Sequence, residues 1–298
     1  MTQPTIYCSV VIRVRNQARH LHQVLQALAA QRCSFPWEII IVDNESDDET
    51  LALCEQYQAR VVSISRAEFT YGKALNLGIR QARGELVFLC SAHAIPIGSY
   101  FLEAAVAPFT DPQVAAARCL SGSYKEQTAL WYAARDIHYP SYEEQQAAEA
   151  GSKWLTDYPS ASCCIIRRAV WEQIPYNEEL EAMEDKLWAR EVLKKGFKIR
   201  SCAEAVFIYN RQRTRGAAWK KLNREHRALY RVLGQVPLPW GRFFFTLGRA
   251  ILLAPLAGVR YIVEIVAPGL YLVSIPLQVR FGQRGTGSIS EYNRHNPR

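Results

Sequence analysis

The chain has 298 residues, enough for one large domain or for one domain with an appendage. Hydrophobic residues make up 49% and charged residues 21%, which is ordinary for a soluble globular protein. The formal net charge is +8, and residues 197–298 carry 17 Lys and Arg against four Asp and Glu. This asymmetry predicts a basic surface for anionic lipid or phosphate, or a merely solvated basic face. A nucleic-acid partner is not predicted, because the basic end lacks a recognisable nucleic-acid-binding module.

The eight cysteines are scattered, lack C-x-x-C spacing, and several stand inside apolar runs. This distribution favours a reducing compartment over a disulfide framework. The N-terminus has no charged start followed by an apolar core, so no signal peptide is expected. Together these features predict a cytoplasmic protein.

Short apolar runs alternate with helical patterns through the first part of the chain. Buried strands are expected at 8–12, 37–42, 60–64, 86–90, 114–119 and 160–167. Helical spacing of apolar residues occurs at 21–29, 51–57, 74–82, 99–109 and 184–196. A capping box at Ser46 and Glu49 and a left-handed cap at Gly84 are expected at helix ends. Strands that alternate with helices predict an α/β fold with a mainly parallel central sheet and right-handed crossovers.

Polar residues follow three of these strands at the point where each ends, at 13–16, 43–50 and 91–93. Because ligands bind beyond the carboxyl ends of strands in open α/β sheets, we expect a site at this edge, with Asp43 where a ribose or base would lie. The acidic run after Asp43 is also what a helix N-terminus favours by itself. The chain has neither the glycine fingerprint of dinucleotide folds nor a P-loop, so this half alone leaves both interpretations open.

Six blocks of sequence carry a resemblance to a known family. They are 11–16 (Val-Ile-Arg-Val-Arg-Asn), 42–50 (Val-Asp-Asn-Glu-Ser-Asp-Asp-Glu-Thr), 68–78 (Glu-Phe-Thr-Tyr-Gly-Lys-Ala-Leu-Asn-Leu-Gly), 86–96, 167–172 and 184–190. In this order they resemble the inverting family 2 glycosyltransferases of the GT-A fold, and in particular their rhamnosyltransferase-like branch. The resemblance covers about residues 8–210.

The resemblance implies a GT-A domain at residues 1–215, with a donor-nucleotide half at 1–98 and an acceptor half at 99–215. It also implies a nucleoside-diphosphate-sugar donor, UDP- or dTDP-linked, at the strand ends. Asp43 would contact the base or ribose, and Lys73 and Asn76 the base or diphosphate, although Lys73 can equally be an exposed helix lysine. The residues implied to contact the donor are Arg13, Val14, Asn16, Asp43, Asn44, Glu45, Lys73, Asn76, Ser91, Ala92 and His93.

The family usually holds Mg²⁺ or Mn²⁺ with paired aspartates, and this sequence has Ser91 and His93 at those positions. His93 has three interpretations: a metal ligand, better suited to Mn²⁺ than to Mg²⁺; a protonated group that neutralises the diphosphate; or a structural histidine. A further histidine of the family falls at Ile208, which binds no metal. These two departures argue against the divalent cation that the resemblance implies. Three arginines could neutralise the diphosphate instead: Arg211, Arg213 and Arg215.

Glu184 and Asp185 open a predicted helix. Adjacent acids at a helix start also serve the helix dipole, which is one interpretation. The resemblance implies a second, in which Asp185 is the catalytic base and Glu184 its neighbour. An inverting transfer needs one carboxylate to take the proton of the attacking acceptor hydroxyl.

Residues 216–298 are expected to form a basic and apolar helical extension. The apolar runs at 250–259 and 261–279 are too short or too interrupted to predict a membrane span. Arginines flank both runs, so residues 240–281 are expected either to lie in a membrane interface, at the inner face of the cell membrane, or to form a helical cap or dimer surface.

These features predict an inverting glycosyltransferase that moves a sugar from a nucleoside-diphosphate donor to a saccharide or lipid-linked acceptor, for a cell-surface polysaccharide. The resemblance makes rhamnose from a dTDP donor the first candidate. The alternative is a non-catalytic protein of the same fold that binds nucleotide-sugar or glycan, since the usual aspartates are missing.

Overall fold

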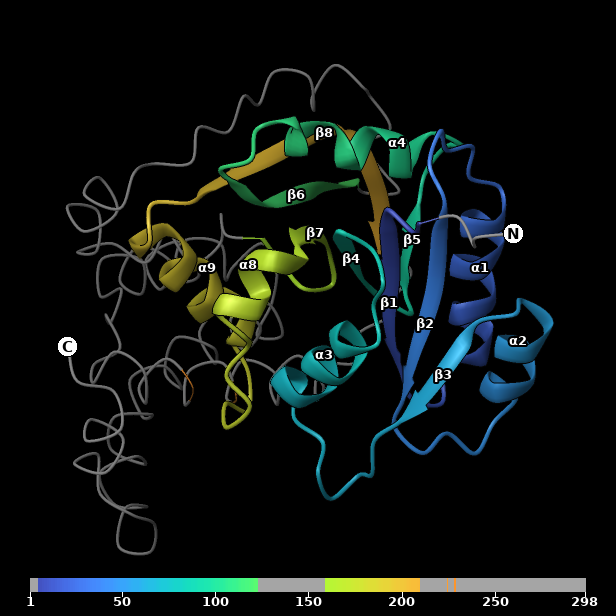
Figure 1. Ribbon diagram of the computed structural model, residues 1–298. Coiled ribbons are helices and arrows are strands. Elements are labelled where there is room, and N and C mark those ends of the chain that lie inside the picture. Colours follow the sequence, from blue (N-terminus) through green and yellow to red (C-terminus); the bar gives the residue numbers. More distant parts are fainter. Residues whose placement is uncertain (1–4, 123–158, 210–223, 225–227, 229–298) are drawn as a thin grey trace, which may run out of the picture. The chain divides into compact units, whose positions relative to one another are not determined.

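The computed structural model describes residues 5–122 and 159–209, together with Arg224 and Ala228 (Figure 1). The chain divides into two units, one made of Met1–Ala148 and Lys153–Gln212, the other of Glu149–Ser152 and Arg213–Arg298. Every helix and strand given below belongs to the first unit. The predicted boundary after residue 215, the arginines at 211, 213 and 215, and the apolar segment 240–281 lie outside the described residues and stay predictions.

An eight-stranded sheet forms the centre of the first unit, in the order β3-β2-β1-β4-β7-β6-β8-β5. Its strands are β1 (Cys8–Val14), β2 (Trp37–Asp43), β3 (Arg60–Ser63), β4 (Leu86–Ser91), β5 (Ala94–Pro96), β6 (Val114–Gly122), β7 (Cys163–Arg167) and β8 (Lys198–Tyr209). The first four strands by sequence are parallel to one another, and β6 is parallel to β8. β7 runs antiparallel between β4 and β6, and β5 is antiparallel to β8. The expected α/β fold with a mostly parallel sheet is confirmed.

Helices cover both faces of this sheet (Figure 1). They are α1 (Ala18–Ala29), α2 (Thr50–Gln56), α3 (Tyr71–Arg80), α4 (Phe101–Val106) with a 3-10 turn at Ala107–Thr110, α8 (Arg168–Gln173) and α9 (Glu184–Lys194). Alternate residues of the buried strands point to opposite faces. Val10 and Ile12 of β1 therefore pack in the cluster with α1 and α4, while Val11 packs in the cluster with α3, α8 and α9.

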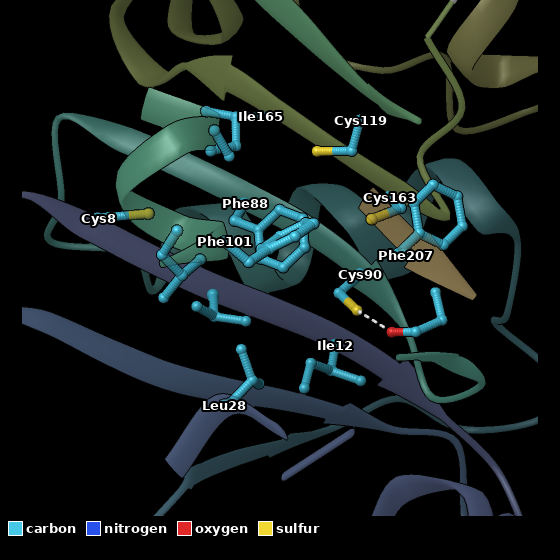
Figure 2. Packing of buried hydrophobic residues seen from close by; sticks show 14 of the residues in the cluster. Cys8, Ile12, Leu28, Phe88, Cys90, Phe101, Cys119, Cys163, Ile165 and Phe207 are labelled. Carbon is cyan, nitrogen blue, oxygen red and sulfur yellow. Dashed lines mark hydrogen bonds between the residues drawn. The ribbon is translucent and has the colours of Figure 1, made fainter. Parts of the chain in front are cut away.

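Aromatic rings and thiols pack among aliphatic side chains on the α1 and α4 face (Figure 2). Phe88 of β4 meets Phe101 of α4 with ring centroids 5.4 Å apart. All eight cysteines are free, and seven are buried. Burial raises the pKa of the Cys8 thiol to about 12 and raises that of Cys90 further. These thiols are therefore protonated near neutral pH and act as small hydrophobic side chains, as expected.

Two expectations about helix ends are wrong. At the start of α2, the Thr50 amide donates to Asp48 Oδ1 at 3.1 Å, while Ser46 Oγ accepts instead from the amide of Asn16 at 3.0 Å, so no capping box forms. Gly84 is not left-handed, and α3 already ends at Arg80. Gly84 is required because a Cβ there would lie 2.8 Å from the Ser9 nitrogen on β1.

Among the described residues, no helix has both the length and the apolar character that a membrane crossing needs. The prediction of interfacial helices concerns residues that are not described, and it is neither supported nor opposed by this finding.

Candidate functional site

The carboxyl ends of β1 and β2 meet at Asp43, which is 2% exposed. The Asn44 amide donates to the Val14 carbonyl at 3.0 Å, which holds the two strand ends together. Asp43 Oδ2 accepts from the Ser46 amide at 3.1 Å. Asp43 Oδ1 is buried and makes no hydrogen bond with the part of the protein that the structure describes. A buried carboxylate oxygen without a donor is costly, so this atom is an acceptor suited to a bound ligand.

The loops that follow β1 and β2 are bonded to each other. Asn16 and Asp47 exchange two hydrogen bonds, of 2.7 and 2.9 Å. Asn16 and Glu45 both have left-handed backbones, with φ of 48° and 51°. Arg66, just beyond β3, forms ion pairs of 3.4 Å with Glu45 and Asp47. Sequence reasoning missed Arg66, because nothing local to it shows that its loop lies beside the one after β2.

Several residues predicted to contact the donor have side chains that serve the fold. Val14 is buried in the hydrophobic cluster, Ala92 is 1% exposed, and the side-chain Nδ2 of Asn44 donates to the Ile64 carbonyl at 3.0 Å. Lys73 lies half-buried in the first turn of α3, where its amide is capped by Thr70 Oγ1. Its donor contact stays a prediction.

Asn76 is corrected from a donor contact to a structural residue. It is 1% exposed, and its carboxamide makes four hydrogen bonds within the protein. Oδ1 accepts from Trp171 Nε1 at 2.8 Å and from the Tyr176 amide at 3.1 Å. Nδ2 donates to the Tyr176 carbonyl at 2.9 Å and to Glu178 Oε1 at 2.8 Å. Two donors and two acceptor positions are the full capacity of a carboxamide, so none is left for a nucleotide.

The end of β4 lies beside the residues that precede β7. The Ser91 amide donates to the Ser162 carbonyl at 2.9 Å, although the two residues are 71 positions apart. His93 is half-buried, with Nδ1 3.3 Å from Gln17 Oε1 and its ring 5.7 Å from that of Tyr209. Burial raises the pKa of Tyr209 to about 12, so its hydroxyl stays neutral near pH 7. Tyr209 is a further residue of this corner that the sequence did not indicate.

The start of α9 reaches the same corner through the residues before β7. Asp185 Oδ2 accepts from the Ala161 amide at 3.1 Å, and Oδ1 accepts from the Lys186 amide at 2.8 Å. The residue before the helix, Met183, has a left-handed backbone with φ of 68°. Because Ala161 adjoins Ser162, which bonds Ser91, the fold brings Asp185 and the end of β4 together.

Glu184 faces the end of β1. It is 5% exposed, and its Oε1 lies 3.6 Å from Arg13 Nη1. Burial, and then the charge of Asp185, raise its pKa to about 7, while Arg13 and Lys186 act in the opposite direction. Glu184 is therefore a buried member of an ion pair, and Asp185 is the more exposed of the two acids.

The sequence profile of Glycosyl transferase family 2 matches residues 9–174, more than half of the chain. The chain belongs to this family.

Relatives of this family 2 glycosyltransferase include two from Salmonella. The O-antigen chain rhamnosyltransferase RfbN of Salmonella typhimurium is 26% identical over 213 residues, which cover 69% of this chain and 67% of that protein. The O-antigen chain rhamnosyltransferase WbaN of Salmonella anatum is 28% identical over 176 residues, 57% of this chain and 55% of that protein. The chain thus spans little more than half the length of WbaN.

A solved structure shows the same fold. The mannosyltransferase PcManGT from Pyrobaculum calidifontis, in complex with GDP-Man and Mn²⁺, superposes with a TM-score of 0.62 at 16% identity, covering 95% of this chain and 89% of that one. This likeness confirms the expected GT-A fold class.

The residues that this family 2 enzyme presents at the end of β4 do not fit a divalent ion. Within 5–122 and 159–209, no three His, Cys, Asp or Glu side chains gather where they could hold a metal. The Ser91 hydroxyl already lies 3.4 Å from the Ser162 carbonyl. Ile208, where a further histidine was expected, pairs with Ile95 across β8 and β5. Among residues 91–93 at the end of β4, His93 alone has a side chain of a kind that binds such ions through nitrogen, and one imidazole does not make a site.

The raised pKa of Glu184 makes a prediction about stability. Between about pH 4.5 and 7 the unfolded chain loses this proton while the folded enzyme retains it, so folding weakens as pH rises through that window. Relative to Glu184→Gln, the wild type should therefore lose at most about 3 kcal/mol of its free energy of unfolding between about pH 4.5 and 7. Urea unfolding at several pH values measures this difference.

In a matched control, Glu103→Gln, the stability difference from the wild type should change with pH in the opposite direction. Hydrogen bonds from Ser34 lower the pKa of Glu103, so the wild type should gain stability over Glu103→Gln as pH rises toward 4.5. If the difference in free energy of unfolding between the wild type and Glu184→Gln is the same from pH 4.5 to 7, the raised pKa of Glu184 is contradicted.

Proposed function

We propose that this enzyme transfers a sugar, with inversion, from a nucleoside-diphosphate donor to a saccharide or lipid-linked acceptor of a cell-surface polysaccharide. The observation that carries the proposal is one sheet edge that holds both a buried, unpartnered acceptor atom, Asp43 Oδ1, and a positioned carboxylate, Asp185. The two Salmonella relatives are named rhamnosyltransferases, so rhamnose from a dTDP donor is the first candidate.

In this proposal Asp43 holds the nucleoside. Its Oδ1 accepts a hydrogen bond from the base or from a ribose or deoxyribose hydroxyl, which would satisfy a buried carboxylate oxygen that the described part of the protein leaves without a donor. The bonded loops carrying Asn16 and Glu45 support the strand ends around Asp43.

The diphosphate is neutralised by cationic side chains in this proposal. His93 at the end of β4 contributes when it is protonated, together with the arginines predicted at 211, 213 and 215. This assignment follows from the donor chemistry of Ser91 and His93, which does not fit a divalent ion.

Asp185 acts as the general base. It accepts the proton of the acceptor hydroxyl while that oxygen attacks the anomeric carbon and the nucleoside diphosphate leaves. Two backbone amides orient its carboxylate, which lowers the cost of positioning it at each turnover. Membership of a glycosyltransferase family supports this enzyme over the non-catalytic alternative.

The acceptor and the cellular location belong to the proposal as well. A lipid-linked saccharide would bring the substrate to the inner face of the cell membrane, where the predicted segment 240–281 would make a peripheral contact. Vesicle flotation of the full chain with anionic vesicles tests this contact.

Replacing Asp43 by asparagine tests the donor site. Calorimetric titration of the full chain with dTDP and with UDP, each with Mn²⁺ and with EDTA, should show binding that survives EDTA. Asp43→Asn should weaken it by about 10- to 100-fold, because a hydrogen bond to a charged group contributes about 1.5–3 kcal/mol.

The control is Asp111→Asn, which removes an acid just before β6. Asp111 lies at the amino ends of the parallel strands, away from the carboxyl ends that carry Asp43. This variant should bind dTDP and UDP as the wild type does. Wild-type affinity in Asp43→Asn would overturn the donor assignment, and loss of binding in EDTA would restore a metal to the site.

A further inference from the structure

We propose that Arg13 is a positioning residue for the transfer, which acts by holding the segment that carries Glu184 and Asp185 rather than by binding the donor. The inference rests on the proposed role of Asp185 as the base. It changes the part that the resemblance gave Arg13, which was a contact with the donor nucleotide.

Arg13 lies near the carboxyl end of β1, a strand with neighbours on both sides in the sheet. It lies in β1 between Val42 of β2 and Ser91 of β4, and its side chain is 12% exposed. A guanidinium cannot lose its charge in a protein, so its burial has to be compensated by neighbouring groups. Those neighbours show what Arg13 is bound to.

Three groups surround the guanidinium, and two belong to the second half of the described chain. Nη2 donates to the Ala161 carbonyl at 3.3 Å, and Nη1 lies 3.6 Å from Glu184 Oε1. The ring of Tyr71, at the start of α3, lies 5.2 Å from Cζ, within the range of a cation–π contact. Nη1 is buried and makes no hydrogen bond, so the ion pair with Glu184 is its main compensation.

Ala161 connects Arg13 to the base. Its carbonyl accepts from Arg13, and its amide donates to Asp185 Oδ2 at 3.1 Å. One residue thus holds the arginine at its carbonyl and the catalytic carboxylate at its amide. A shift of the guanidinium would move this segment, and with it the donor that orients Asp185.

The backbone at the start of α9 needs such a support. A left-handed conformation is unfavourable for a residue other than glycine, and Met183 adopts one immediately before Glu184. Surrounding contacts have to maintain it. Glu184 directly follows Met183, and its contact with Arg13 holds this part of the backbone in place. The contact therefore helps to set the direction in which the side chain of Asp185 points.

The test separates positioning from donor binding. Arg13→Met keeps most of the side chain's length and its packing on Tyr71 but removes the charge and both donor groups. We expect kcat, measured as dTDP release from dTDP-rhamnose with a lipid-linked saccharide acceptor, to fall about 10- to 100-fold. The dissociation constant for dTDP should change less than about threefold. Arg13→Lys, which keeps the charge, should recover part of kcat.

A double-mutant cycle keeps the test valid if Arg13→Met is unstable. Removing Arg13 alone leaves Glu184 buried without its counter-ion, whereas Arg13→Met with Glu184→Gln removes both charges. The double variant should be more stable than Arg13→Met alone and no slower. Arg32→Met, an exposed arginine after α1, is the control and should match the wild type in kcat and melting temperature.

Two results would overturn the inference. Wild-type kcat in a folded Arg13→Met would show that the contacts are unimportant for turnover, and a loss of dTDP affinity equal to the loss of kcat would return Arg13 to the donor site. The proposed function fails separately, if Asp185→Asn retains full turnover whatever Arg13→Met does.

Discussion

Asp185→Asn is expected to lower kcat by about 10²–10⁴-fold, the usual contribution of a positioned general base. Asparagine retains one carbonyl oxygen that can accept from the Ala161 amide and loses the bond from the adjacent Lys186 amide, so the link between α9 and the segment before β7 should be kept. What the variant loses is the ability to take a proton from the acceptor hydroxyl. The affinity for dTDP should therefore stay within about threefold of that of the wild type.

The measurement combines dTDP release under saturating donor with calorimetry on the same preparation. Glu191→Gln is the matched control, because it neutralises another acid of α9 that only pairs with Lys194 on the surface. It should retain wild-type kcat. If Asp185→Asn also retained it, the two acids at the helix start would serve only the helix dipole and backbone bonding.

The environments of Glu184 and Asp185 decide which of them is the better base. Glu184 is almost fully buried and holds Arg13, so it has little access to an incoming hydroxyl. With a pKa of about 7, it also carries its proton for much of the time at neutral pH. Asp185 is half-buried, and within the described residues its hydrogen bonds come from backbone amides, which orient a carboxylate without neutralising its charge.

The sequence was sufficient for the parallel half of the fold because its information is local. Runs such as 86–90 are apolar at every position, which only a strand buried on both faces requires, and the helices between them have a clear apolar period. The position of β7 between β4 and β6 could not be read in this way. It depends on pairing between residues such as Cys90 and Cys163, which lie far apart in the chain.

The same limit applies to the candidate site. Asp43 was identified because it directly follows a strand, a local signal that fixes where its side chain lies. The contact of Arg13 with Ala161 joins residues 148 positions apart, and no pattern near either of them indicates it. The capping box does not form for a related reason, since Ser46 Oγ accepts instead from the amide of Asn16 in the loop after β1.

Asn76→Leu is expected to lower the free energy of unfolding by about 3–6 kcal/mol. Leucine has the same branched arrangement of side-chain heavy atoms as asparagine but leaves Trp171 Nε1 and both backbone groups of Tyr176 buried without this partner. Each buried polar group left unpaired costs about 1–3 kcal/mol. In a domain of this size the melting temperature should fall by on the order of 10 °C.

The control for this variant is Gln26→Leu, which replaces an exposed carboxamide on α1 and should change stability by less than about 0.5 kcal/mol. A similarly small change in Asn76→Leu would mean that its four hydrogen bonds add little, and would reopen a role for Asn76 at the donor.

The reason for expecting a large effect is the position of Asn76 on α3. Gly72, one turn earlier, is so close to the Asn177 carbonyl that a Cβ there would overlap it, and Arg80, one turn later, pairs with Glu178 at 3.0 Å. This face of α3 therefore holds the segment that leads to Met183 and the base. Loosening it should lower kcat in Asn76→Leu even at temperatures where the enzyme is still folded, because α3 and Arg13 support the same carboxylate from two sides.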